Sequence, residues 1–224
     1  MQNLFQVFLD FRYTLFEGVV QTLYMTFVSV VLAYAIGLPL GVLLYTTQAE
    51  GIFKNKTLNV AASAIINMVR SIPFIIIMVV LIPFTRIIVG TAIGSTAAIV
   101  PLVIAAAPFI ARMVETTLNE LDRGVIDAAR AMGASNFQII YKVIIPENVP
   151  SLIRGAAITT IMTISLSAMA GAVGAGGLGR IAIAYGHQRF RTDIMLVTIV
   201  IIIVMVGIVQ FAFNTLAAKI DRKK

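Results

Sequence analysis

Few residues of this chain could perform covalent or acid–base chemistry. The sequence has no Cys, and His187 is its single histidine, so thiolate chemistry is excluded and a histidine-rich metal site is not expected. Ser165 and Ser167 lie in an apolar stretch without a His or Lys that could activate a nucleophile. We therefore interpret both serines as packing or pore-lining hydroxyls, and we predict that the chain is not an enzyme and holds no metal or cofactor of its own.

One glycine-rich segment has the spacing of a nucleotide-binding loop. Gly174–Gly179 matches the pattern G-x-G-x-x-G, which binds dinucleotides only between a strand and a helix of a soluble βαβ unit. Here it follows a long apolar run, so we expect a flexible or closely packed turn near a membrane surface instead. The P-loop pattern G-x-x-x-x-G-K-[ST] is absent from the sequence, so ATP binding through a P-loop is not expected.

The composition is that of a membrane protein. Apolar residues make up 59% of the chain and charged residues 12%, against about 45–50% and about 25% in a soluble domain. The apolar residues form long runs separated by short polar stretches. A formal charge of +7 could suggest a nucleic-acid partner, but the basic residues lie between the runs and at the C-terminus. That placement indicates membrane topology and no nucleic-acid footprint.

Five apolar stretches approach the roughly 20 residues that a helix needs to cross a bilayer. The sequence therefore predicts an all-α membrane protein with five transmembrane helices. Gly37 with Gly41, and Gly90 with Gly94, have the spacing of close helix contacts. The stretches are Val19–Leu44, Ser71–Phe84 (lengthened by Leu58–Val69, with Arg70 between), Ala92–Ile110, Ala156–Val173 and Ile194–Ala218.

The basic residues predict the orientation. A tail with Lys219, Arg222, Lys223 and Lys224 should be cytoplasmic, and five spans then place the N-terminus outside. We expect an external or interfacial segment (1–17), a transmembrane domain (18–218) and a basic cytoplasmic tail (219–224). Basic residues at 54, 56 and 112–142 agree with this orientation, whereas those at 180, 189 and 191, on the last external loop, do not.

The predicted apolar cores contain no Asp, Glu, Lys or His. Ion-coupled transporters usually carry ionisable groups at membrane depth, although broken helices with backbone ligands can replace them. A transporter with these spans would therefore take its energy from another subunit. An ion-coupled secondary transporter or channel remains the alternative, and a non-transport membrane scaffold is a second one.

The longest polar interruption, residues 112–150, has helical order. Asp122 can cap a helix that runs to about Met132, and Gly133 suits the left-handed residue after it. Ser135–Gln138 has the form of a capping box that opens a second helix, which Pro146 should stop. The sequence thus predicts two short helices joined by a glycine turn.

This helical loop has the features of a docking element. Ala128 and Ala129 would keep its first helix thin enough to enter a groove on a partner, with Asp127 and Arg130 as polar rim contacts. Apolar contact would come from Val125, Ile126 and Met132. An amphipathic loop that lies on the bilayer is the alternative.

Two sets of residues resemble a known family. Asp127–Gly133, followed after nine residues by Val143–Pro146, is similar to the EAA loop of binding-protein-dependent ABC importer permeases; Asp127, Val143 and Ile145 replace the usual Glu, Ile and Leu. Between about residues 58 and 192, further segments resemble the methionine-uptake branch of that family, although Ser165-Leu166 and Arg180 depart from it. These segments are Arg70–Phe74, Ile82–Arg86, Ala105–Phe109, Ser167–Val173, Gly176–Gly179 and Tyr185–Phe190.

The resemblance implies the type I ABC importer permease fold and a multi-pass subunit of the bacterial cytoplasmic (inner) membrane. Such permeases pair as homodimers with the pathway at the interface and work by alternating access. Two ABC ATPases, which hold the ATP and Mg, bind the paired loops, and an extracytoplasmic substrate-binding protein delivers the cargo. The expected cargo is methionine (L- and/or D-) or a closely related amino acid.

The resemblance also implies roles for individual residues. Candidate pathway residues are Ser165, Ser167 and Met169, with plain core packing as the alternative. Candidate contacts to the binding protein are Arg180, His187, Arg189 and Arg191, with an exposed basic loop without a partner as the alternative. The ATPase-coupling loop, about residues 115–150, would use Asp127, Ala128, Ala129, Arg130, Met132, Gly133 and Pro146.

Overall fold

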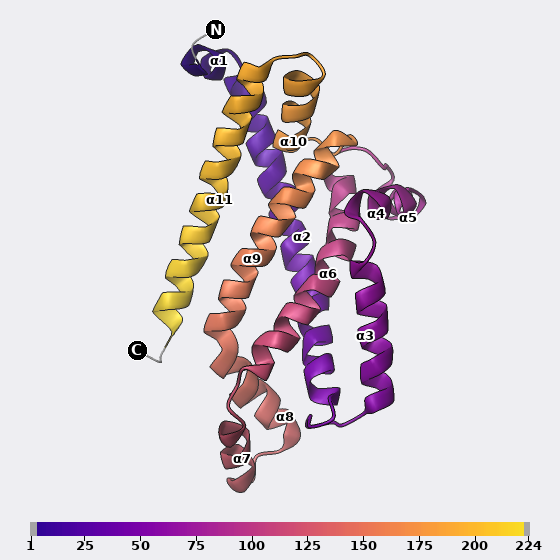
Figure 1. The fold of residues 1–224 in the computed structure, drawn as a ribbon, viewed down its shortest axis with the longest axis vertical. Coiled ribbons are helices and arrows are strands. Elements are labelled where there is room, and N and C mark those ends of the chain that lie inside the picture. Colours follow the sequence, from indigo (N-terminus) through magenta and orange to yellow (C-terminus); the bar gives the residue numbers. More distant parts are fainter. Residues whose placement is uncertain (1–3, 222–224) are drawn as a thin grey trace.

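A computed structural model describes residues 4–221 and, within them, all regular secondary structure is helical. Four long helices form a bundle (Figure 1): α2 (Arg12–Thr47), α6 (Ser95–Asn119), α9 (Ile145–Ala172) and α11 (Thr192–Ile220). The shorter elements are α1 (Leu4–Asp10), α3 (Lys56–Arg70), α4 (Phe74–Val80), α5 (Ile82–Val89), α7 (Arg123–Ala131), α8 (Asn136–Gln138), the π-helix η1 (Ile139–Ile144), α10 (Gly177–Ile181) and the π-helix η2 (Ala182–His187).

The expected second span is broken. The four long helices are each long and apolar enough to cross a membrane, whereas α3 and α4 are bent by 95° at the break between them. Pro73 causes the break, because proline supplies no backbone donor and disfavours the helical conformation at the residue before it. Helix α3 alone is about 22 Å long at ~1.5 Å per residue, too short for a bilayer core of about 30 Å. The second predicted stretch therefore consists of two helices at a steep angle, and the chain has up to five spans only if the bent pair counts as one.

Helices α2 and α6 pack closely through two glycines. A Cβ atom on Gly41 would lie 2.5 Å from Val114 Cβ and 2.7 Å from the Ala111 carbonyl oxygen. Gly37 meets Ala107 and Ile110 in the same way, so the predicted close contact of this pair is confirmed.

The other glycine pair was assigned wrongly. Gly90 ends α5 with φ +83°, and Gly94 precedes α6 with φ +100°. No atom lies within 4 Å of a Cβ built on either of them. They serve the loop between two helices, because left-handed backbone conformations favour glycine.

The glycine-rich segment after α9 is a packed turn. Gly174, Gly176 and Gly177 all have positive φ. The backbone N–H of Gly177 donates to Gln21 Oε1 (2.7 Å), and that of Leu178 donates to Thr22 Oγ1 (2.9 Å). These bonds attach the start of α10 to α2, so the loop amides that could cradle a phosphate already have partners within the chain.

The first and last helices place the two ends of the bundle (Figure 1). Helix α1, α10 and η2 lie at one end, here called the α1 end. The connection from α2 to α3, helices α7 and α8, and the last turn of α11 lie at the other, the α7 end. The first and last described helices therefore begin and end on opposite sides of the bundle. Residues Arg222, Lys223 and Lys224 of the predicted basic tail lie outside the described residues.

Candidate functional site

Helix α7 has caps at both ends. The Asp122 carboxylate accepts a hydrogen bond from the Gly124 N–H at 2.8 Å. At the other end, the N–H of Gly133 donates to the Arg130 carbonyl (2.9 Å) and that of Ala134 to the Ala129 carbonyl (3.1 Å). With φ +81° at Gly133, this is a Schellman motif, so the predicted helix and its glycine end are confirmed.

The second helix begins as predicted but does not stop at Pro146. The predicted capping box is present, with Gln138 Oε1 accepting from the Ser135 N–H (2.8 Å) and Ser135 Oγ accepting from the Gln138 N–H (3.4 Å). The helix then continues through η1 into α9. Pro146 lies in the first turn of α9. The wider turns of the π-helix before it give the proline ring room beside the preceding carbonyls.

The inner face of α7 is part of this chain's own core. Ile126 and Ala129 are 8% and 3% exposed, in a cluster that includes Leu118 of α6 and Ile139 and Ile144 of η1. Our expectation that Ile126 and Ala129 face a partner is therefore wrong. The same contacts fasten α7 to α6 and to the start of α9, so a displacement of α7 would be transmitted to two long helices.

The outer face of α7 is open. Asp127, Ala128, Arg130 and Met132 are exposed. Arg130 Nη1 lies 3.7 Å from Asp127 Oδ1 with both side chains about half exposed or more, and such a surface pair contributes little to stability. Met132 is 81% exposed. Exposed apolar side chains are informative where they gather in one patch and not where they occur singly.

Two exposed aromatic residues lie on the second helix, and neither was predicted from the sequence. Phe137 and Tyr141 are 70% and 57% exposed. Their i, i+4 spacing on the second helix places them on one side of it, which was the available signal. We call Val125, Ala128, Met132, Phe137 and Tyr141 the α7 face.

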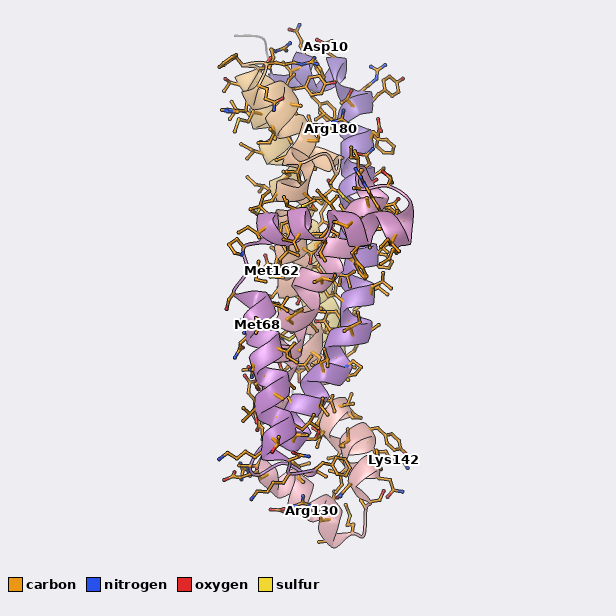
Figure 2. All side chains as sticks on the ribbon, turned by 90° about the vertical axis from the view of Figure 1, so that its right-hand side faces the viewer. Asp10, Met68, Arg130, Lys142, Met162 and Arg180 are labelled. Atoms are coloured by element: carbon orange, nitrogen blue, oxygen red, sulfur yellow. The ribbon has the colours of Figure 1, made fainter. Side chains whose placement is uncertain are left out.

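The α7 face is braced by the connection between α2 and α3. Arg123, in the first turn of α7, forms an ion pair with Glu50, and the rings of Phe53 and Phe137 lie 5.4 Å apart. A polar groove separates the two segments, lined by residues such as Gln48 and Arg130. Figure 2 shows Arg130 and Lys142 at this end of the molecule.

The candidate pathway residues on α9 divide between two faces. Ser165 is exposed and Met169 is 46% exposed, one turn apart on the same side of the helix. Ser167 is 1% exposed, and its hydroxyl donates to the Ile164 carbonyl at 2.7 Å. The structure thus leaves Ser165 and Met169 available to line a pathway and places Ser167 in the packed interior.

The four candidate contacts to the binding protein lie at the α1 end, but three of them are exposed and the fourth is held in an ion pair. Arg180, His187 and Arg189 are exposed, and Arg189 lies over the Tyr185 ring at 4.6 Å. Arg191 instead donates from Nε and Nη2 to the Asp193 carboxylate (2.9 and 2.7 Å). This hydrogen bonding raises the pKa of Arg191 above its ordinary value. Arg191 is therefore bound to the first turn of α11, unlike the three exposed basic residues.

Phe190 is a further exposed residue at this end that was not predicted from the sequence. It is 89% exposed with φ +55°, a strained conformation for a large side chain.

No cluster of three or more His, Cys, Asp or Glu side chains suited to a metal ion occurs within residues 4–221.

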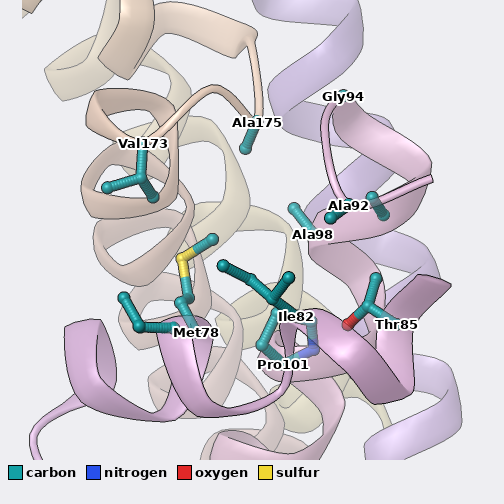
Figure 3. Close-up of a pocket in the computed structure, with 11 residues that line it drawn as sticks. Met78, Ile82, Thr85, Ala92, Gly94, Ala98, Pro101, Val173 and Ala175 are labelled. Atoms are coloured by element: carbon teal, nitrogen blue, oxygen red, sulfur yellow. The ribbon is translucent and has the colours of Figure 1, made fainter.

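A small apolar pocket separates α4 and α5 from the start of α6 (Figure 3). Its volume is about 50 Å³, and Thr85 carries the one hydroxyl among its eleven lining residues. A hollow of this size and polarity suits no amino acid.

Comparisons with known proteins agree with this architecture. A family described as "Binding-protein-dependent transport system inner membrane component" matches residues 37–224. The chain is 48% identical to the probable D-methionine transport system permease protein MetI of Vibrio cholerae over 203 residues, covering 91% of this chain and 90% of the relative. It is 56% identical to D-methionine transport system permease protein MetI of Escherichia coli over 157 residues, 70% of this chain and 72% of the relative.

A solved structure matches the fold. A chain of the MetNI methionine ABC transporter, in inward facing conformations, superposes with a TM-score of 0.93 at 50% sequence identity. The match covers 95% of this chain and 99% of that one.

Proposed function

The chain belongs to the family of binding-protein-dependent transport system inner membrane components, and from this premise we propose that it is the permease subunit of an ATP-driven methionine importer. The observation that carries the proposal is the α7 face, an exposed apolar surface on a helix whose other side is built into the bundle. The 50% identity to a chain of the MetNI transporter supports the same conclusion.

The proposed partners follow from that relative. Two copies of the chain pair across a pathway, and each α7 face binds one copy of a separate ABC ATPase. ATP and Mg are held and hydrolysed in the ATPase, and this chain supplies no catalytic group. A substrate-binding protein docks at the α1 end, where Arg180, His187, Arg189 and Phe190 are exposed.

The proposed orientation places the α7 end in the cytoplasm. Arg130 and Lys142 lie at this end (Figure 2), and the elements there also carry Lys54, Lys56 and Arg123, in agreement with the positive-inside rule. The exposed apolar α7 face lies beyond the spans, where lipid does not cover it. It therefore needs a water-soluble protein as its partner. In this orientation residues 1–17 are external or interfacial, residues 18–218 form the transmembrane domain and residues 219–224 form a cytoplasmic tail.

The proposed mechanism is alternating access. When the ATPases close on ATP, they draw the two α7 helices together. Ile126 and Ala129 transmit that movement to α6 and to η1, which continues into α9. Helix α9 carries Ser165 and Met169, the proposed lining of the pathway, so motion at the ATPase reaches the cargo through one continuous helix.

The proposed cargo is methionine, as L-, D- or both enantiomers. The names of the curated relatives support this cargo. An ion-coupled secondary transporter or channel is the alternative, and the family membership disfavours it.

Methionine-stimulated ATP hydrolysis tests the proposal. The permease, its ABC ATPase and the loaded substrate-binding protein, assembled in nanodiscs, should hydrolyse ATP faster with L- or D-methionine than with an unrelated amino acid. Failure of the ATPase to co-purify with the permease would contradict the proposed function.

A further inference from the structure

Arg70 is a cation at an unusual depth. It is the last residue of α3, at the 95° break before α4, and it is exposed. Met68 and Met162 lie about half-way along the bundle (Figure 2), and Arg70 lies one half-turn beyond Met68. Placing a guanidinium at membrane depth costs free energy. Arginines at this depth line a pathway or pair with an acceptor group.

The chain offers Arg70 no carboxylate. Arg70 takes part in none of the ion pairs found among residues 4–221. The sequence contains no Asp or Glu between Glu50 and Glu115, or between Glu147 and Asp193. A second copy has the same sequence, so pairing two copies adds no acid to those stretches either. Within the described chain, Arg70 is therefore available to an anionic ligand.

Arg70 borders a groove with apolar walls. Phe74, Phe109, Met162 and Leu166 line it together with Arg70, from α3, α4, α6 and α9. Its volume is about 270 Å³, near the lower end of the roughly 300–1,000 Å³ of ligand sites, whereas the pocket of Figure 3 holds about 50 Å³. The thioether of Met162 and the two aromatic rings suit a flexible apolar side chain, including another thioether.

We propose that this groove is the transit site for the cargo, with the Arg70 guanidinium binding the α-carboxylate of the amino acid and Phe109, Met162 and Leu166 holding its side chain. The proposal rests on the proposed function, and it names the site within the permease where an amino acid is held. A guanidinium matches a carboxylate through two parallel N–H···O bonds, so the site selects ligands that combine a carboxylate with an apolar side chain. Lipid phosphate shares the anionic chemistry, and the analogues used below distinguish it.

Thiol protection tests occupancy directly. The chain has no Cys, so in Leu166→Cys the introduced thiol is the only one in this subunit. In the assembled complex, L-methionine should slow maleimide labelling of Leu166→Cys, and L-methioninol, which lacks the carboxylate, should not. Ile93→Cys, on the exposed loop before α6, should label at one rate with either compound. Protection that persists in Arg70→Gln/Leu166→Cys, or equal protection by L-methioninol, would overturn the assignment.

Transport by charge variants separates the site from the proposed function. In proteoliposomes with the ATPase and the binding protein, Arg70→Gln should lower the rate of methionine uptake, or raise the methionine concentration that half-saturates uptake, by about tenfold or more. A tenfold change corresponds to about 1.4 kcal/mol. Arg86→Gln removes a cation of α5 that does not line the groove, and should retain wild-type uptake.

The two failures have different signatures. Methionine uptake by the wild type with unchanged uptake by Arg70→Gln would overturn the site and leave the function standing. Absence of uptake by the wild type would overturn the function itself. If Arg70→Gln fails to assemble, Arg70→Lys serves in its place: it keeps the charge without the paired donors and should give an intermediate loss, whereas wild-type uptake by it would count against the paired contact.

Discussion

Gly133 is the most exacting test of the α7 loop, because its replacement by Ala changes backbone strain and little else. Its φ is +81°, and no atom lies within 4 Å of a Cβ built there, so Ala meets no clash within the chain. The left-handed conformation costs an L-residue about 1–2 kcal/mol. If this strain opposes the loop shape that the ATPase binds, affinity for the ATPase should fall roughly 5- to 30-fold.

Binding of the purified ATPase to the permease in nanodiscs measures this effect. Gly90→Ala is the matched control, since Gly90 has φ +83° and equally open surroundings but lies in the loop between α5 and α6. It should suffer the same strain and bind the ATPase normally. Gly133→Asn tests the cause, because Asn adopts the left-handed conformation readily and should restore most of the affinity. Wild-type affinity for Gly133→Ala, or an equal loss in Gly90→Ala, would refute the reasoning.

Three further predictions concern packing and contact. Ala129→Leu overfills the buried side of α7 and should destabilise the permease by about 1–3 kcal/mol, whereas Ala128→Asp on the exposed side should leave thermal unfolding unchanged and abolish ATPase co-purification; the reverse pattern would contradict the assigned faces. Gly41→Leu collides with α6 and should prevent recovery of folded permease, while Gly207→Ala, with nothing within 4 Å, should be neutral; normal yield of Gly41→Leu would refute the close packing. Arg189→Gln should weaken stimulation of ATP hydrolysis by sub-saturating binding protein, and unchanged stimulation would remove that residue from the docking surface.

The sequence was sufficient where a local rule determines the structure. Asp122, Gly133 and Ser135 were assigned to caps, and each makes the expected backbone hydrogen bond or adopts the expected conformation. Such features depend on a few neighbouring residues, so their patterns transfer directly from sequence. The four long helices follow from apolar length for the same reason.

The errors arose where tertiary context decides. Composition alone cannot show that Pro73 bends the second apolar stretch, since lipid-exposed helices often tolerate proline when neighbours satisfy the freed groups. Pro146 is the opposite case, because the π-helix before it preserves the helix. The i, i+4 spacing of Gly90 and Gly94 resembles a packing motif but belongs to a loop.

The candidate site was predictable in outline but not in its faces. The helix at residues 123–131 was located correctly, yet only the packed structure shows that Ile126 and Ala129 face inward while Met132 and Phe137 face outward. A helix of nine residues offers too few positions for periodicity to separate the two sides. The groove beside Arg70 was not predicted at all, since its walls come from three segments far apart in sequence, around residues 69–77, 105–109 and 162–166.

ATP-dependent uptake of radiolabelled methionine tests the central claim most directly. Proteoliposomes that contain this chain, its ABC ATPase and its substrate-binding protein should accumulate methionine when ATP is supplied to the side of the α7 face. Omission of the ATPase, or Ala128→Asp in this chain, should abolish accumulation. Accumulation driven by an ion gradient without the ATPase would contradict the account.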